Sequence, residues 1–81
     1  MKINYQNQNA MEVMVFKTSV DTLQSVKALR PLLDSMAGSG RWNFALDDCD
    51  KILRIASLKV NAQTAIRLLQ DNGYDCAELE D

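Results

Sequence analysis

The chain has 81 residues, of which 47% are hydrophobic and 25% are charged, a composition typical of a single globular domain and unlike that of a disordered or fibrous protein. Nine Lys and Arg against eleven Asp and Glu give a formal net charge of -2, and no basic run is available to neutralise a phosphate backbone. No uninterrupted run of about 18 apolar residues occurs either. We therefore expect neither a nucleic-acid partner nor a membrane partner.

Residues 1–10 are polar and rich in Asn and Gln, without the apolar stretch of a signal peptide. We expect this segment to be a flexible tail, and residues 11–81 to form a single domain in the cytoplasm. Cys49 and Cys76 are then expected to stay reduced.

The first half of the domain reads as a strand followed by a helix. An alternation of period two predicts a strand from Met11 to Thr18. Asp21 followed by Gln24 resembles a capping box and predicts a helix start, and the next Gly-Ser-Gly predicts its end. Pro31 lies inside this helix and is expected to bend it rather than end it. The apolar residues at helical spacing are Leu23, Val26, Leu29, Leu33 and Met36.

A hairpin, a second helix and a last strand are predicted for the second half. Trp42, Phe44 and Leu46 alternate with polar or small residues as a second strand and are expected in the core. Residues 47–50 form a tight polar connection to a third strand at 51–57.

The second helix has a signal at each end. Asn61 predicts its N-cap, and Asn72 with Gly73 predicts its C-terminal stop. Residues 74–79 then predict a fourth strand at a sheet edge. The apolar residues at helical spacing are Ala62, Ala65, Ile66 and Leu69.

The resulting order is βαββαβ. Two right-handed crossovers in this order give a four-stranded antiparallel sheet of order 4-1-3-2 with both helices on one face, the α+β fold called ferredoxin-like. This geometry brings three loops to one end of the sheet, at residues 19–22, 47–51 and 73–76. We expect any binding site at that end.

Three features of the chain point to a known family. Val20 precedes the first helix, residues 42–55 form the hairpin, and residues 72–79 carry a Gly-Tyr pair at the last strand. Together they resemble the heavy-metal-associated domain family, which includes copper chaperones and the soluble metal-binding domains of metal-pumping ATPases. In that family a Cys-x-x-Cys pair in the first loop carries the metal, and alignment on Val20 places those two positions at Thr22 and Ser25. The resemblance implies a ferredoxin-like fold with a degenerate metal loop.

Hydroxyl groups do not replace the missing thiolates. Cu(I) and Zn(II) sites of this kind need groups that ionise near neutral pH, so Thr22 and Ser25 are expected to be ordinary first-turn residues of a capped helix. Cys49 and Cys76 belong to the two outer strands of the predicted sheet, roughly 14 Å apart, too far for a disulfide or a shared metal within one chain. We expect Cys49 to be an exposed turn thiol and Cys76 a small packed residue, while a metal site shared between two copies stays open.

Two further features are candidates for binding. Asp47, Asp48 and Asp50 lack the glycine and closing glutamate of a calcium loop and are expected to form a solvated turn. We expect a partner to dock on an open edge strand or on a candidate interaction face, the sheet face without helices, unless polar neighbours or the N-terminal segment shield that face. It consists of Val13, Val15 and Ile52.

The chain has no histidine, and it has no phosphate-binding glycine loop. We therefore expect a small non-enzymatic domain without a cofactor, an interaction or regulatory module that binds a protein partner or a second copy of itself. The alternative is a copper or zinc carrier that uses Cys76, Cys49 or both in place of the missing loop cysteines.

Overall fold

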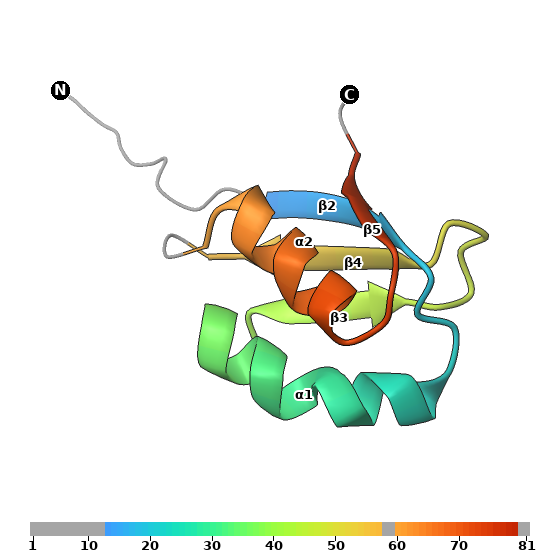
Figure 1. Ribbon diagram of the computed structural model, residues 1–81, viewed down its shortest axis with the longest axis horizontal. Helices are drawn as coiled ribbons and strands as arrows, with labels where there is room; N and C mark the ends of the chain where they lie inside the picture. Colours follow the sequence, from blue (N-terminus) through green and yellow to red (C-terminus); the bar gives the residue numbers. More distant parts are fainter. Residues whose placement is uncertain (1–12, 58–59, 80–81) are drawn as a thin grey trace, which may run out of the picture.

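The computed structural model describes residues 13–57 and 60–79, and the predicted tail at 1–10 lies outside these residues. The described part contains two helices and four strands in the predicted order (Figure 1). In chain order they are β2 (Val13–Thr18), α1 (Leu23–Ala37), β3 (Trp42–Ala45), β4 (Ile52–Ala56), α2 (Ala62–Asp71) and β5 (Cys76–Glu78). Neither of these helices has the length and apolar character needed to cross a membrane.

The strands form one antiparallel sheet of order β3-β4-β2-β5. Numbered by their place in the chain, this is 2-3-1-4, which is the predicted order 4-1-3-2 read from the opposite edge. The α+β, ferredoxin-like fold is therefore confirmed. β2 and β4 are the central strands, while β3 and β5 are the edges (Figure 1).

One hydrophobic core joins both helices to one face of this sheet. Phe16 on β2 and Leu53 on β4 are fully buried, and they belong to the same cluster as Leu33 from α1 and Leu69 from α2. Full burial of an aliphatic or aromatic side chain of this size stabilises a fold by about 1.5 to 3 kcal/mol. Arg54, on the opposite face of β4, is exposed, so the helices cover only one face.

The start of α1 differs by one residue from the prediction. Thr22 is the N-cap residue in place of Asp21, because its carbonyl accepts the first helical bond from the Val26 N–H at 3.2 Å. The Thr22 hydroxyl accepts a second bond from the Ser25 N–H at 3.0 Å. As predicted, the helix continues through Pro31.

The turn between β3 and β4 begins one residue before the predicted end of the strand. The Asp48 N–H donates to the Ala45 carbonyl at 3.3 Å, so Leu46 lies in the turn. Lys51 adopts a φ of 51°, which is uncommon for a residue other than glycine, and its Nζ donates to the Leu46 carbonyl at 2.8 Å. The predicted tight connection is confirmed, with β3 ending earlier than the side-chain alternation suggested.

β5 is also shorter than predicted. The Tyr74 N–H donates to the Leu69 carbonyl at the end of α2, and the Asp75 N–H donates to the Ser19 hydroxyl at 2.9 Å. Both donors are therefore unavailable to the sheet, and the strand begins only at Cys76.

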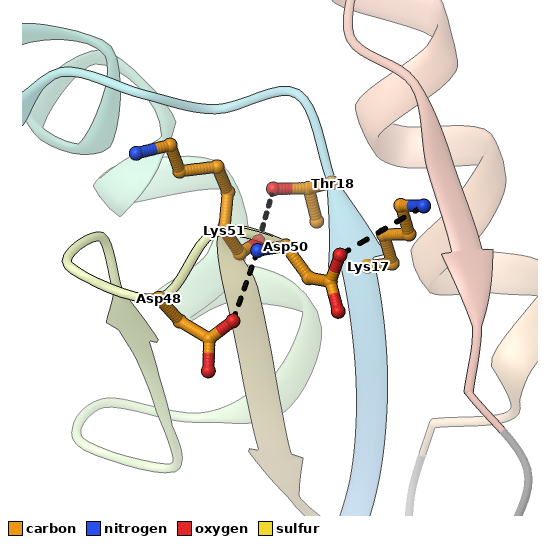
Figure 2. A network of polar contacts seen from close by, with 5 residues as sticks. All are labelled: Lys17, Thr18, Asp48, Asp50 and Lys51. Carbon is orange, nitrogen blue, oxygen red and sulfur yellow. Dashed lines mark hydrogen bonds and ion pairs between the residues drawn. The ribbon is translucent and has the colours of Figure 1, made fainter.

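The last residue of β2 connects the three loops that the fold brings to one end. The Thr18 N–H lies 3.2 Å from both the Asp50 and Lys51 carbonyls. Its buried hydroxyl donates to the Lys51 carbonyl at 2.7 Å (Figure 2). The same hydroxyl accepts from the Val20 N–H at 3.1 Å. With the contact of Ser19 to the β5 entry, the predicted convergence of the loops is confirmed.

Substitution of Thr18 by Val should lower the free energy of unfolding by about 1 to 3 kcal/mol, because it removes both hydroxyl bonds in a buried place while keeping the side-chain volume. Urea unfolding followed by circular dichroism measures the change. Thr64→Val is the matched control, since the Thr64 hydroxyl bonds to Asn61 in an exposed position, and its cost should stay within about 0.5 kcal/mol. Equal losses in the two variants would contradict the role given to Thr18.

Candidate functional site

The positions that match the family's metal ligands carry a helix cap. Thr22 is the N-cap of α1 and Ser25 lies in its first turn. The Thr22 hydroxyl donates to the Ser25 hydroxyl at 3.0 Å while it accepts the Ser25 N–H. Both oxygens are thus engaged with each other and with the helix start, which is an ordinary structural use of these residue types.

The two cysteines lie in different environments, and both are free. Cys49 is exposed in the turn between β3 and β4, whereas Cys76 is 7% exposed at the start of β5, opposite Thr18 in the ladder. Burial raises the pKa of the Cys76 thiol to about 11. A soft metal needs the thiolate, whereas the Cys76 thiol stays protonated at neutral pH. Cys76 therefore serves as a packed residue of the core.

The acidic turn brings three potential metal ligands together, two carboxylates and one thiol. The side-chain ligand atoms of Asp48, Cys49 and Asp50 all lie within 4.8 Å of one another. Asp48 Oδ1, however, accepts the Asp50 N–H at 2.9 Å, and Asp50 Oδ1 lies 3.8 Å from Lys17 Nζ (Figure 2). Both carboxylates therefore already serve the turn, with an exposed ion pair of the kind that contributes little to stability.

The sheet face opposite the helices is less apolar than expected. Val13 is 60% exposed, but Ile52 is only 5% exposed, so the expectation that Ile52 is accessible is wrong. The physical reason is its central position, since Ile52 lies between Lys17 on β2 and Ala45 on β3. Val15, half-buried, lies opposite Arg54, so charged neighbours alternate with the apolar residues of this face.

A groove of about 400 Å³ lies on the other side of the molecule, between α1 and the edge strand β3. Figure 1 shows α1 running beside β3. Arg30 and Asp34 of α1 place one positive and one negative charge along it. The apolar residues that line the groove are Leu23, Val26, Trp42, Phe44 and Leu46.

Trp42 lines this groove and connects its two sides. Its Nε1 donates to Asp34 Oδ1 at 2.7 Å, a bond that joins the edge strand to α1. Its ring meets the Phe44 ring edge-to-face, with centroids 6.0 Å apart and planes at 74°. Trp42 was expected in the core, and it is half-buried, packed against the core while it lines the groove.

The outer edge of β3 presents backbone groups beside the groove. The Arg41 carbonyl accepts from the Ala56 N–H at 2.8 Å and therefore faces β4, whereas the Arg41 N–H donates to the Gly38 carbonyl at 3.1 Å. Backbone direction alternates along an antiparallel strand, and the N–H and C=O groups of Trp42 and Phe44 therefore point away from β4. No described strand lies on that side.

The sequence reasoning missed the groove although two signals for it were present. Leu23 is the first residue of the apolar stripe of α1, yet it is 72% exposed. The predicted sheet order also places the strand with Trp42 and Phe44 at an edge. Taken together, a helix stripe that extends past the core and an aromatic edge strand indicate an apolar surface open to solvent.

No protein-family model, no curated protein and no solved structure matches the chain. The resemblance to the heavy-metal-associated domain family stays a prediction that rests on the position of Val20, the hairpin at residues 42–55 and the closing Gly-Tyr strand.

Alkylation with iodoacetamide at about pH 8 should modify Cys49 and spare Cys76 in the folded protein, because Cys76 is buried and its pKa is raised to about 11. Peptide mass spectrometry reads the two sites separately. In denaturant both cysteines should react, and the folded Cys49→Ser variant should take up almost no label. Rapid native-state labelling of Cys76 would contradict its place in the core.

Proposed function

We propose that this domain is a non-enzymatic protein-interaction module that binds its partner along the groove between α1 and β3. One observation carries the proposal: an apolar groove of about 400 Å³ adjoins a strand edge whose outward backbone groups have no described strand beside them. Strand addition with side chains placed in a neighbouring groove is a recurring mode of peptide recognition.

The groove is a better candidate than the open sheet face. Along the groove, Leu23 and the rings of Trp42 and Phe44 contribute apolar surface beside the charged Arg30 and Asp34. On the sheet face, Lys17 and Arg54 separate the valines, and Ile52 is buried. Removal of apolar surface from water is the main driving force of association. The groove has more apolar side chains available to a partner than the open sheet face has.

The absence of catalysis is part of the same proposal. The chain contains no histidine, and the pKa of Cys76 is raised rather than lowered, the reverse of what a nucleophilic cysteine needs. A cytoplasmic location also belongs to the proposal, and it is supported by the two free thiols, which suit a reducing compartment.

A selection of phage-displayed random peptides on the folded protein tests the groove. Selected peptides should bind in extended form, and Leu23→Ser should weaken them about tenfold or more, since Leu23 is exposed and lines the groove. Fluorescence polarisation with a synthetic copy of a selected peptide measures the affinity. Leu32→Ser, at a second exposed leucine of α1 that does not line the groove, is the matched control and should bind as the wild type does. A failure to select any peptide, or equal binding by both variants, argues against the groove.

The alternative function, a copper or zinc carrier, is favoured by the proximity of Asp48, Cys49 and Asp50. Under our proposal, the reduced protein should retain no Cu(I) or Zn(II) in native mass spectra. The double variant Thr22→Cys/Ser25→Cys should gain Cu(I), because the two side-chain oxygens lie 3.0 Å apart at a helix N-terminus, which lowers thiol pKa values. Metal retained by the wild type and lost in Cys49→Ser or Cys76→Ser would establish the carrier instead.

A further inference from the structure

We propose that the segment bound at the β3 edge is β3 of a second copy of this chain, paired antiparallel about a two-fold axis. The inference rests on the interaction function proposed above and names its partner. The two sheets would join into one continuous sheet across the paired edges.

Two residues of β3 have backbone groups that are available to a second strand. Trp42 and Phe44 direct their N–H and C=O groups outward, while the Arg41 carbonyl faces β4. Two such residues, separated by one, are the repeat that an antiparallel partner needs. When Trp42 of one copy lies opposite Phe44 of the second copy, each residue donates its N–H to the carbonyl of the other. The two-fold axis forms the same pair of bonds a second time, between Phe44 of the first copy and Trp42 of the second.

The same geometry fixes the register. Residues directly opposite each other in an antiparallel pair share a face, so Asn43 must lie opposite a residue of the second copy that also points away from the helices. Asn43 opposite Asn43 satisfies this condition and keeps the hydrogen-bonded residues inside β3. Centring on Phe44 would place Trp42 opposite Leu46, which lies in the turn.

The strand β3 itself carries none of the sequence features that hinder pairing at an edge. Natural edge strands are commonly blunted by charged residues, proline or bulges. β3 consists of Trp, Asn, Phe and Ala, and its register with β4 is continuous. The opposite edge strand, β5, is shorter and carries the charged residue Glu78.

Charge selects a second copy and its direction. Arg41 precedes β3, whereas Asp47 and Asp48 follow it, and all three are exposed. In an antiparallel pair the basic end of one strand meets the acidic end of the other, twice by symmetry. A second copy therefore supplies unlike charges at both ends of the pairing, and a parallel arrangement would bring like charges together.

The proposed pairing also brings apolar side chains of the two copies together. Opposite Phe44 of the second copy, Trp42 extends the edge-to-face pair into a cluster of four rings on the helix side. The exposed Leu23 lies along the same groove and would lose contact with water.

The experiment uses the two-fold axis at Asn43. The variants Asn43→Lys and Asn43→Glu each place like charges directly opposite one another in the proposed dimer, while the exposed position spares the core. Analytical ultracentrifugation of the wild type from about 10 μM to about 1 mM should show a monomer–dimer equilibrium. Each variant alone should raise the dimer dissociation constant about fivefold, and an equimolar mixture should recover association as a heterodimer identified by native mass spectrometry.

Ala77→Lys is the control, because Ala77 is exposed on the same sheet face at the opposite edge and should leave the dimer unchanged. Circular dichroism confirms that each variant is folded, and Asn43→Glu, which lies opposite Arg54, retains the test if Asn43→Lys does not fold. A wild type that stays monomeric, a dimer insensitive to both Asn43 variants, or a dimer lost in Ala77→Lys would overturn the inference. If the monomer still binds selected peptides in a Leu23-dependent way, the interaction function stands and only the second copy is excluded as the partner.

Discussion

The contacts of Thr18 are the constraint on which this end of the structure depends. Its N–H and hydroxyl reach the carbonyls of the hairpin turn, and the hydroxyl also accepts the Val20 N–H of the loop that leads to α1. The Val20 N–H is buried and the Lys51 carbonyl is partly buried, so each would carry a desolvation cost if left unpaired. A single threonine at the end of a central strand thus sets the position of the hairpin turn and of the loop before α1.

The polar groups at the loop end have partners, whereas the outward backbone groups of β3 have no described strand beside them. At the loop end, Thr22 and Ser25 are bonded to each other, and the carboxylates of Asp48 and Asp50 have partners in the turn and on Lys17. At the β3 edge, by contrast, the outward backbone groups lie beside exposed apolar side chains. Association is favoured where outward backbone groups and apolar surface coincide, and this is the physical basis of the interaction module that we propose for the groove.

The helix start illustrates how the same positions can serve different chemistry. A thiolate pair at an exposed helix N-terminus suits a soft metal, because the N–H groups and the metal both favour the ionised sulfur. Hydroxyls at Thr22 and Ser25 instead accept a backbone donor and hydrogen-bond to each other. Such a cap stabilises a helix by about 1 kcal/mol, so these residues contribute to the fold without any ligand.

The local pattern of the chain by itself determined the element order, the strand faces and the N-cap of α2. Alternation placed Phe16 and Leu53 on the buried face, and Asn61 marked the start of α2, because these signals act within a few residues. Tertiary contacts decided the rest. Asp75 bonds to Ser19, far away in the chain, and this shortens β5, while the neighbours of Ile52 on two strands bury a residue that alternation assigned to solvent. Periodicity tells which way a side chain points, but only the packed structure determines what covers it, and the placement of α1 decided that a groove opens beside β3.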